Sequence, residues 1–545
     1  MMQKASRHWQ SLQRAKLHKE IGFQIPLTEM LTGFFIAFIS DMWYNRFNHF
    51  MKGSHIESRG IGSMGKLNDL NPKDVFYYFE EICKIPHGSG NTQKISDYLR
   101  EFAKERNLEH YQDEIGNIII IKEASPGYED HAPVMLQGHM DMVTVKEPDC
   151  AVDMTKEGLK LVVSGDRLMA EGTSLGGDDG IAVAYGLALM DGNYRHPRLE
   201  LVITVDEEVG MNGARVLDVT PLKAKRLINL DSEEEGIFLS GCAGGARVNM
   251  DFSYEPVLRK GASFQVTVKG LKGGHSGAEI HKERGNAICL LGRILYRLLS
   301  ETAFCIEKLE GGVADNAIPI SAGAGLLLTG SEDEQEKLIQ ICAKAEKEFK
   351  VELQDKDGEV FVEVRREGDR EIPVMAEDLS QRAALLLNAL PHGVQAMSAT
   401  MPGLVETSLN PGILETTEGS IRVGISVRSS IDSAKAALIG QLKSIGALAD
   451  ARVEVTGDYP GWTYRKESLL REKMVDSYRK LYGEEPKVEA IHAGVECGLL
   501  AYKIPELDCV SIGPEMKNIH TTEEELSISS AERVWNYLLN VLQVL

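Results

Sequence analysis

The chain has 545 residues, more than one hydrophobic core usually organises, so at least two domains are expected. Its formal net charge of −21 argues against nucleic acid as a partner, because binding nucleic acid needs clustered Lys and Arg. The eight cysteines are scattered in a large chain, which predicts reduced thiols and a cytoplasmic location.

Residues 1–63 contain several basic side chains, among them Lys4, Arg7 and Arg14, before a short apolar run at 31–40. A basic start followed by an apolar stretch resembles a signal peptide, but no small-residue cleavage site follows. The run is also shorter than the roughly 20 residues that span a membrane. We therefore interpret 1–63 as an extension of doubtful status, and we expect no stable membrane association. Met64 would be a natural start.

The next part of the chain, 64–244, has the pattern of an α/β domain. A helix, a turn and a second helix are predicted over 71–107. Nearly continuous apolar strands then alternate with helical patterns, which is typical of a mainly parallel sheet flanked by helices. The predicted strands are 117–122, 133–137, 199–205 and 226–230, and a helix is predicted at 180–190.

Beyond Gly244 the pattern changes to long alternating strands and longer helices, which predicts an inserted α+β lid domain over 245–459. The α/β pattern then returns over 460–545, so we expect the second domain to be inserted into the first. The predicted elements of this last part are a helix at 467–482, strands at 487–492 and 507–512, and a helix at 530–544.

Two stretches in the first domain carry candidate metal ligands. In the sequence GHMD, His139 and Asp141 are two residues apart, so an extended chain puts both on one side. Asp141 could hold the second ring nitrogen of a metal-bound His139, although ordinary polar capping also explains the pair. Asp178 and Asp179 open the predicted 180–190 helix, where carboxylates suit the positive end of the helix dipole. Helix capping and metal binding are both open for this pair.

Three further stretches follow predicted strands. Asp206, Glu207 and Glu208 end the third strand, and three adjacent acids repel one another unless a cation is near. One of these glutamates could bind a metal while its neighbour faces a water molecule. Asp231 ends the fourth strand, and His520 lies in the loop after the last one. Singly, either residue would be unremarkable.

Together these stretches predict a two-metal site, because ligands of α/β sheets bind beyond the carboxyl ends of the strands. Two histidines and three carboxylates, with one carboxylate bridging, give each of two metal ions three protein ligands. That leaves positions open for water, as catalytic zinc requires. The predicted ligands are His139, Asp178, Glu208, Asp231 and His520.

Longer motifs occur around these residues in a fixed order, including QGHMDMV, VDEEVGMNGA, NLDSEEEG, LKGGHSGAEIHKERGNAI, DNAIP, SVRSS, IHAGVECGLL and IGPEMKNIHT. From about Met64 to Leu545 the chain resembles the M20 metallopeptidase family, and within it subfamily C, the aminoacyl-histidine dipeptidases. Two features depart from the family pattern. They are the N-terminal extension and Gly177, where alanine is expected before the bridging aspartate.

The resemblance implies roles for individual residues around two zinc ions, for which Co²⁺ or Mn²⁺ are possible substitutes. One zinc ion takes His139 and Asp231, the other takes Glu208 and His520, and Asp178 bridges them. Glu207 is implied as the general base, and Asp141 as the residue that orients His139. The implied substrate-binding residues are His275, Asn316, Arg428 and Gly494.

The expected function is metal-dependent hydrolysis of dipeptides, such as Xaa-His, and of other short unblocked peptides. The oligomeric state stays open, with a homodimer as one alternative. Other M20-type activities, an N-acyl amino acid deacylase or a carboxypeptidase, stay open because they share the metal site and differ in the lid pocket. A non-catalytic metal-binding scaffold is a third alternative. It is disfavoured because a pure binder needs no general base beside Glu208. For the lid residues, the residue pattern alone also allows a surface turn around His275 and an exposed strand end at Arg428.

Overall fold

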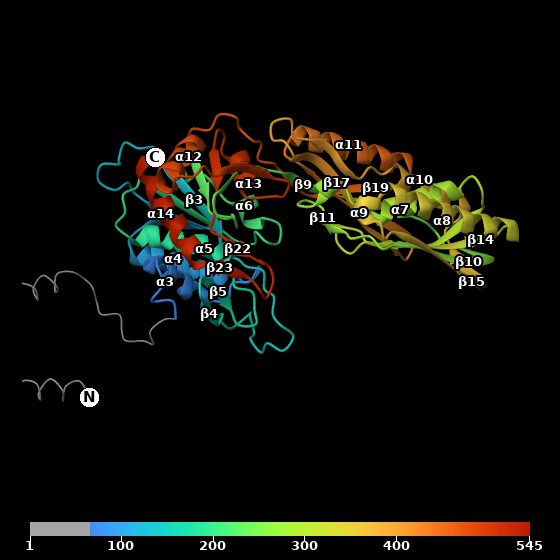
Figure 1. The fold of residues 1–545 in the computed structure, drawn as a ribbon, viewed down its shortest axis with the longest axis horizontal. Coiled ribbons are helices and arrows are strands. Elements are labelled where there is room, and N and C mark those ends of the chain that lie inside the picture. Colours follow the sequence, from blue (N-terminus) through green and yellow to red (C-terminus); the bar gives the residue numbers. More distant parts are fainter. Residues whose placement is uncertain (1–65) are drawn as a thin grey trace, which may run out of the picture. The chain divides into compact units, whose positions relative to one another are not determined.

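The computed structural model describes residues 66–545, and the predicted extension 1–63 lies outside them. Within the described residues the strands form two large sheets and two small ones. Figure 1 shows each large sheet with its own set of helices. Each large sheet also has its own hydrophobic core.

The first large sheet has eight strands and a parallel centre. The pairs β6–β3, β3–β7 and β7–β21 are all parallel, whereas β1–β2 and β2–β6 at one edge are antiparallel. The predicted mixed, mainly parallel sheet is therefore confirmed. In spatial order the strands are β1 (Glu109–Gln112), β2 (Ile118–Lys122), β6 (Leu199–Thr204), β3 (Val134–His139), β7 (Arg226–Asn229), β21 (Asp508–Ser511), β8 (Ile237–Cys242) and β20 (Lys487–Ile491).

Helices cover both faces of this sheet, as successive side chains of its strands show. Leu136 packs into one core cluster and its neighbour Met135 into another, because side chains alternate along a strand. The first cluster includes the almost wholly buried helix α5, whose apolar sequence fits its place against the sheet. The helices of this part are α3 (Lys73–Cys83), α4 (Gln93–Glu105), α5 (Gly177–Asp191), α6 (Asn212–Val216), α12 (Leu469–Tyr482), α13 (Cys497–Lys503) and α14 (Ile528–Val544).

A small four-stranded sheet lies at the edge of this core and joins segments far apart in the sequence. Its order is β22 (Met516–Lys517), β23 (Glu525–Ser527), β5 (Arg167–Ala170) and β4 (Leu161–Ser164). Leu526 of β23 is paired with Leu168 of β5, so the C-terminal hairpin is held beside the segment that leads into α5. The short stretch between β22 and β23 contains His520.

The second large sheet has nine strands, and all of its pairings are antiparallel. Its strands are β15 (Phe361–Val374), β10 (Val257–Lys269), β14 (Ala322–Leu328), β12 (Phe304–Gly311), β17 (Val405–Thr417), β18 (Ser420–Ser429), β9 (Gly244–Ser253) and β19 (Arg452–Tyr459), with β16 (Gly393–Met397) paired to β17. They come from the part of the sequence where the pattern changes to long alternating strands.

The helices of this second part pack onto the nine-stranded sheet through apolar side chains such as Leu291 of α7 and Leu442 of α11. They are α7 (Ala287–Leu298), α8 (Glu332–Glu352), α9 (Gln354–Asp357), α10 (Glu377–Ala389) and α11 (Asp432–Leu448), with a 3₁₀ turn, η1 (Ile280–Lys282). A two-stranded ribbon, β11 (Gly274–His275) with β13 (Ala317–Ile318), brings the GGHSG and NAIP motifs together.

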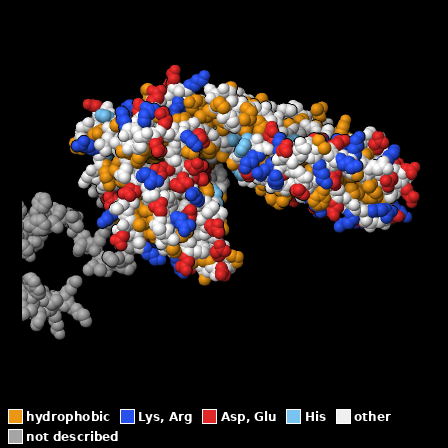
Figure 2. Space-filling model, viewed as in Figure 1, with side chains coloured by type: hydrophobic (Ala, Val, Ile, Leu, Met, Phe, Trp, Pro, Cys, Tyr) orange, Lys and Arg blue, Asp and Glu red, His pale blue; other side chains and the backbone are white. Residues whose placement is uncertain are grey.

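Three general features of the described residues bear on the sequence-based predictions. All eight cysteines lie among them, and none forms a disulfide, as predicted. Of the helices in 66–545, none is both long and apolar enough for a membrane span. On the face shown in Figure 2, acidic and basic side chains are interspersed over both large sheets and their helices.

Candidate metal centre and active site

The candidate ligands His139, Glu208 and Asp231 are positioned by three neighbouring strands. His139 is the last residue of β3, Glu207 and Glu208 follow β6, and Asp231 follows β7. Because β6, β3 and β7 are adjacent and parallel, their carboxyl ends meet at one edge of the sheet. The predicted convergence of these side chains is therefore present.

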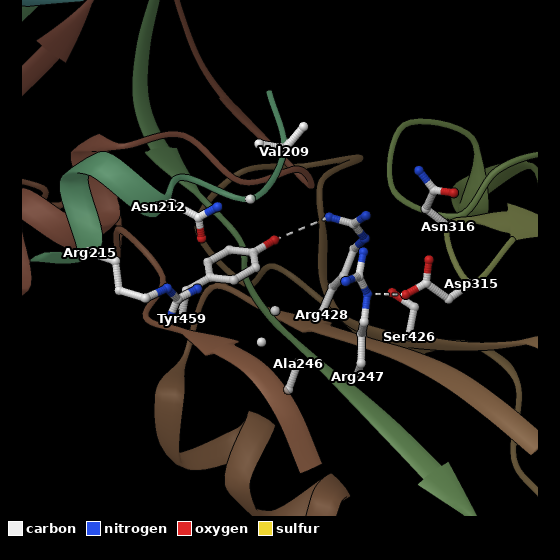
Figure 3. A pocket seen from close by; sticks show the side chains of 13 residues that line it. Val209, Asn212, Arg215, Ala246, Arg247, Asp315, Asn316, Ser426, Arg428 and Tyr459 are labelled. Atoms are coloured by element: carbon white, nitrogen blue, oxygen red, sulfur yellow. Dashed lines mark hydrogen bonds and ion pairs between the residues drawn. The ribbon is translucent and has the colours of Figure 1, made fainter. Parts of the chain in front are cut away.

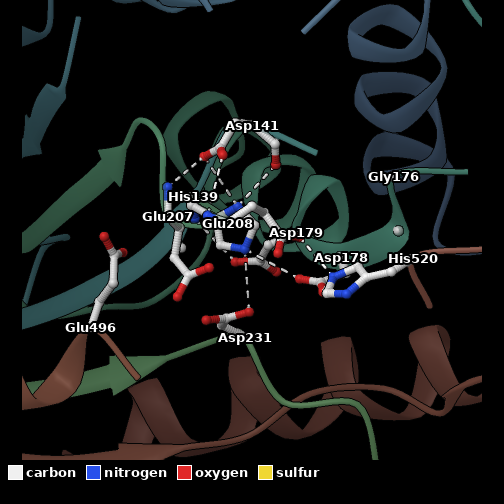
Figure 4. Close-up of polar contacts among 12 residues, drawn as sticks. His139, Asp141, Gly176, Asp178, Asp179, Glu207, Glu208, Asp231, Glu496 and His520 are labelled. Atoms are coloured by element: carbon white, nitrogen blue, oxygen red, sulfur yellow. Dashed lines mark hydrogen bonds and ion pairs between the residues drawn. The ribbon is translucent and has the colours of Figure 1, made fainter. Parts of the chain in front are cut away.

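Asp178 lies between the two histidines (Figure 4). Its Oδ1 is 3.2 Å from Nε2 of His139, and its Oδ2 is 3.1 Å from Nε2 of His520. Each histidine also faces a second carboxylate. His139 Nε2 is 3.5 Å from Asp231 Oδ1, and His520 Nε2 is 2.9 Å from Glu208 Oε1. The five residues thus form two His–carboxylate clusters that share Asp178.

The donors in this cluster fit divalent metal ions. Ligand atoms of His139, Asp178 and Glu208 lie within 4.8 Å of one another, and so do those of His139, Asp179 and Asp231. Imidazole nitrogens and carboxylate oxygens are the ligands that zinc takes at catalytic sites. Burial raises the pKa of Asp231 to about 6, and the charges of Asp178 and Glu208 add to this effect. A cation bound among these carboxylates would favour their ionised form.

Asp141 ties the end of β3 to the segment after β6. Its carboxylate accepts the backbone N–H of Glu207 at 3.0 Å and the hydroxyl of Ser89 at 2.8 Å. His139 Nδ1 lies 2.9 Å from the backbone oxygen of Asp141 and 3.5 Å from its Oδ1. The ring is therefore oriented by the same residue that the sequence singled out, with the carbonyl as the closer partner. This leaves Nε2 facing the carboxylates.

Glu207 lines the same cavity as the candidate ligands but makes no side-chain contact with either histidine among the hydrogen bonds and ion pairs of the described residues. Burial raises the pKa of the Glu207 carboxyl well above its usual range; nearby His139 opposes that rise, while Asp231 and Glu496 add to it. A carboxylate with a raised pKa accepts a proton more readily near neutral pH.

A cavity of about 840 Å³ opens over the candidate ligands. Two predicted substrate-binding residues, His275 and Gly494, line it together with Asp178, Glu208 and His520. Its walls come from the segments after β7, around β11 and after β20, and from the start of β17. The candidate ligands therefore face a space of the size that small-molecule sites have.

The other two predicted substrate-binding residues, Asn316 and Arg428, line a separate cavity of about 370 Å³ (Figure 3). Arg428 Nη1 is 3.5 Å from the hydroxyl of Tyr459, and its Nε is buried without a hydrogen-bond partner within the described part of the chain. Arg247 contributes a second guanidinium, which is paired with Asp315. The structure thus brings Asn316 and Arg428 together, outside the cavity that contains the metal ligands.

Arg428 nevertheless lies close to His275 of the larger cavity. A methyl group added at Gly277 would lie 3.0 Å from Cε1 of His275 and 3.3 Å from Cζ of Arg428. The charge of Arg428 also lowers the pKa of His275, after the larger effect of burial. Arg428 is half-buried at the end of β18, so it is not the exposed strand end that the pattern allowed.

Three polar residues around the site were not predicted from the sequence: His492, Glu496 and Glu524. Asp179, the partner of Asp178 at the start of α5, also contributes to the site. Asp179 Oδ2 accepts the backbone N–H of His139 at 3.2 Å. His492 lines the larger cavity, and its Nε2 lies 2.7 Å from the hydroxyl of Ser408. Burial, with the charge of Arg428, lowers the pKa of His492 to about 3, so this imidazole is neutral. His492 and Glu496 both lie in the motif IHAGVECGLL, which was the available signal in the sequence.

Glu496 is wholly buried beside the candidate ligands. Its Oε2 accepts hydrogen bonds from the Thr204 hydroxyl at 2.6 Å and from the Gln137 amide at 2.5 Å. Gln137 in turn accepts from the amide of Asn229 at 2.6 Å. These three partners belong to β6, β3 and β7, the strands that end in the candidate ligands. A polar network therefore links these strands below the metal centre.

With this geometry in hand, the chain can be placed among known proteins. The profile of the peptidase family M20/M25/M40 matches residues 135–544. The chain belongs to this family and is a hydrolase of the metallopeptidase class.

Similar proteins agree with this placement. The chain is 37% identical over 483 residues to the cytosol non-specific dipeptidase of Escherichia coli (strain K12), covering 88% of this chain and 99% of that protein. Among solved structures, an aminoacylhistidine dipeptidase from Vibrio alginolyticus superposes with a TM-score of 0.81 at 36% identity, over 88% of this chain and 98% of the other. The aminopeptidase PepT from Bacillus cereus, at 17% identity and a TM-score of 0.51 over 87% and 98% of the two chains, shares the fold.

Proposed function

We propose that this protein is a cytoplasmic dipeptidase that hydrolyses Xaa-His and other short peptides with a free amino end. The observation that carries the proposal is Asp178, shared between His139 and His520 at 3.2 and 3.1 Å, with Glu207 on the wall of the same cavity. Proteins at 37% and 36% identity over almost their whole length are named as a cytosol non-specific dipeptidase and an aminoacylhistidine dipeptidase, which supports the substrate class.

Two zinc ions, or Co²⁺ or Mn²⁺ in their place, are the proposed cofactors. His139 and Asp231 would hold one ion, Glu208 and His520 the other, and Asp178 would bridge them. When bound, such ions supply Lewis acidity toward the scissile carbonyl and lower the pKa of coordinated water. The two clusters that share Asp178 support this assignment.

Glu207 is the proposed general base. It would accept a proton from the attacking water and return it to the leaving amine, and the raised pKa of its carboxyl suits that exchange. Asp141 would act as a positioning residue, because it contacts both the ring of His139 and the backbone N–H of Glu207. The base and the first ligand are thus held by one residue, through its backbone oxygen and its carboxylate.

The lid residues would bind the two polar parts of a peptide. His275, on the wall of the larger cavity, would donate a hydrogen bond to the oxyanion that develops from the carbonyl. Arg428 and Asn316 would hold the backbone or the C-terminal carboxylate, and the buried Nε of Arg428 offers an unused donor for it. Gly494 would contribute a backbone contact near that end. Movement of the lid would be needed to bring Asn316 and Arg428 onto the same substrate as the metal centre.

The charge of the larger cavity favours a peptide with a free amino group over an N-acylated amino acid. Glu233, Glu234 and Glu489 line it, and their carboxylates make no ion pair within residues 66–545. None of the lining residues is Lys or Arg. An ammonium group entering this cavity gains favourable electrostatic interactions that a neutral acyl group does not. The deacylase alternative therefore fits the cavity less well.

The proposal also covers the setting of the enzyme. We propose a catalytic domain formed by 64–244 and 460–545, with 245–459 as an inserted lid domain. Neither nucleic acid nor a membrane is proposed as a partner. If the protein forms an oligomer, we propose that it is a homodimer.

The test is a panel of substrates containing Xaa-His and other dipeptides, tripeptides and N-acetyl amino acids, each with added zinc and with a chelator. Chelator-sensitive cleavage confined mainly to dipeptides is expected. Cleavage of only the acyl amino acids would reassign the protein as a deacylase. Two bound metal ions without activity on any substrate would favour a scaffold.

A further inference from the structure

Glu524 is a buried carboxylate for which the proposed chemistry has no use. It lies in the stretch between β22 and β23, four residues after His520, and only 4% of it is exposed. A buried carboxylate loses hydration free energy, so its partners must compensate for that loss. Within the described residues, its carboxylate accepts hydrogen bonds from the backbone of one short segment.

That segment is the entry into α5. Glu524 Oε2 accepts the N–H groups of Leu175 at 2.8 Å and Gly176 at 3.0 Å. Its Oε1 accepts the N–H groups of Gly177 at 2.8 Å and Asp178 at 3.4 Å. The first N–H groups of a helix have no partner within the helix, and their dipole favours a negative charge. Glu524, from a distant part of the sequence, supplies both the hydrogen-bond acceptors for these N–H groups and the negative charge.

The fit around these contacts is close. A methyl group added at Gly177 would lie 3.3 Å from Oε1 of Glu524 and 3.2 Å from Sδ of Met516. Gly176 has a φ of +68°, a conformation that glycine adopts without strain, and it turns the chain into the helix. Glycine at 176 and 177 thus lets the backbone approach the carboxylate. The absence of the alanine expected at 177 is consistent with this close packing.

The same carboxylate therefore connects two of the proposed metal ligands. Asp178 is the last residue of the segment that Glu524 holds, and its backbone has a non-helical φ of −83° and ψ of 103° that sets where its carboxylate points. His520 shares a short connection with Glu524, has a positive φ of 62°, and keeps 41% of its side chain exposed. By contrast, His139 and Asp231 are held by the ends of β3 and β7 in the large sheet.

We propose that Glu524 is a positioning residue that fixes Asp178 and His520 relative to each other, and so sets the affinity for the metal ion proposed at His520 and Glu208. This inference rests on the proposed two-metal site but not on the substrate. Loss of the Glu524 contacts frees the N–H groups of 175–178 and loosens the His520 connection at the same time. The ion held by His139 and Asp231 depends less on Glu524, because the sheet positions those two ligands.

The test compares Glu524→Gln with the matched control Glu523→Gln. Glutamine keeps the size of the side chain, but its NH₂ group faces two N–H donors where a carboxylate oxygen accepts them. Glu523 is the neighbouring exposed glutamate, and its carboxylate makes no hydrogen bond or ion pair within residues 66–545. For each metal-depleted protein, the stoichiometry and the two dissociation constants for Zn²⁺ are measured by competition with a chromophoric chelator.

In Glu524→Gln we expect one dissociation constant to stay within about threefold of the unmodified protein and the other to weaken at least tenfold. The Zn²⁺ concentration for half-maximal hydrolysis of a dipeptide should rise by a similar factor, while kcat recovers at saturating Zn²⁺. The Glu523→Gln protein should match the unmodified one. Two unchanged constants in Glu524→Gln, or two that weaken equally, would overturn the proposal. Equal weakening would indicate a general loss of structure.

Two further measurements keep the proposal testable if Glu524→Gln does not fold. Glu524→Asp keeps the charge on a shorter side chain. It should weaken the same one of the two Zn²⁺ dissociation constants, but by a smaller factor than Glu524→Gln does. In the unmodified, metal-free protein, the amides of 175–178 should be protected from hydrogen exchange, and fast exchange there would contradict the proposal. If selective metal loss occurs but no dipeptide is cleaved by the unmodified protein, the inference stands and the proposed substrate fails.

Discussion

Asp178 Oδ2 lies 3.1 Å from His520 Nε2, although 342 residues separate these two residues in the chain. The contact forms because α5 begins beside the β22–β23 hairpin, whose β23 is paired with β5. The cluster of His520, Glu208 and Asp178 is therefore built where the C-terminal hairpin packs beside the start of α5. Its integrity depends on how the C-terminal segment packs.

Replacement of Glu207 by glutamine should abolish most turnover without removing metal. Glutamine cannot accept a proton from water, and loss of a general base typically costs about 10²–10⁴-fold in rate. We expect kcat for a dipeptide to fall in this range, with the metal-to-protein ratio unchanged. Glu418→Gln, in the exposed turn between β17 and β18, is the control. A Glu207→Gln enzyme with near-normal kcat would exclude this residue as the base.

Replacement of His139 by alanine should instead remove metal. The variant lacks the ring nitrogen that faces both Asp178 and Asp231, so the metal ion proposed there would lose one of its three protein ligands. We expect metal content after dialysis to fall by at least one ion per chain and activity to fall with it, as measured by mass spectrometry and a dipeptide assay. Full metal content in the His139→Ala protein would show that His139 is not a ligand.

Replacement of Glu233 by glutamine tests how the cavity recognises the amino end of a peptide. Burial raises the pKa of Glu233 to about 7, so this group is at least half ionised from pH 7 upward. Removing its charge in that range should weaken the attraction for an ammonium group, by an amount typical of partly exposed charge pairs, about 0.2–1 kcal/mol. KM for a free dipeptide should therefore rise up to about fivefold with kcat little changed. The same dipeptide carrying an N-acetyl group serves as the reference substrate. An equal change for both substrates would contradict a role in amine recognition.

Replacement of Glu496 by glutamine should change how stability depends on pH. Burial raises the pKa of Glu496 from 4.5 to about 7, so the folded protein holds this proton more tightly than the unfolded chain does. Stability from this group is therefore greatest below pH 4.5 and decreases as the pH rises toward 7. Glutamine stays neutral and keeps an acceptor for Thr204 and Gln137.

Thermal unfolding of the metal-free proteins between pH 5 and pH 8 measures this difference. As the pH rises, the free energy of unfolding of the Glu496→Gln protein should increase relative to that of the unmodified protein. The relative increase should reach about 3 kcal/mol at pH 8, since one pKa unit corresponds to about 1.4 kcal/mol. A difference in melting temperature that is constant over this range would indicate that Glu496 does not titrate there.

Much of the fold was predictable because its signals are local. The apolar runs that became β2, β3, β6 and β7 are short and nearly continuous, which is typical of strands buried on both faces. The change to alternating strands near Gly244 coincides with the first strand of the nine-stranded sheet. Short elements such as β4, β5, β22 and β23 were not predicted. Their few residues carry little periodicity, and they are strands only because they pair with one another.

The sequence by itself identified His139, Glu208 and Asp231 as candidate metal ligands, because each stands at or shortly after the end of a strand, and the ends of these strands share an edge. The tertiary structure alone decided the distances. It put His520 against Asp178, separated the cavity of Arg428 from that of the metal ligands, and buried Glu524 under the start of α5. Periodicity and spacing report on neighbours within a turn or a strand. Contacts across hundreds of residues depend on how sheets, hairpins and helices pack, and no local pattern encodes that packing.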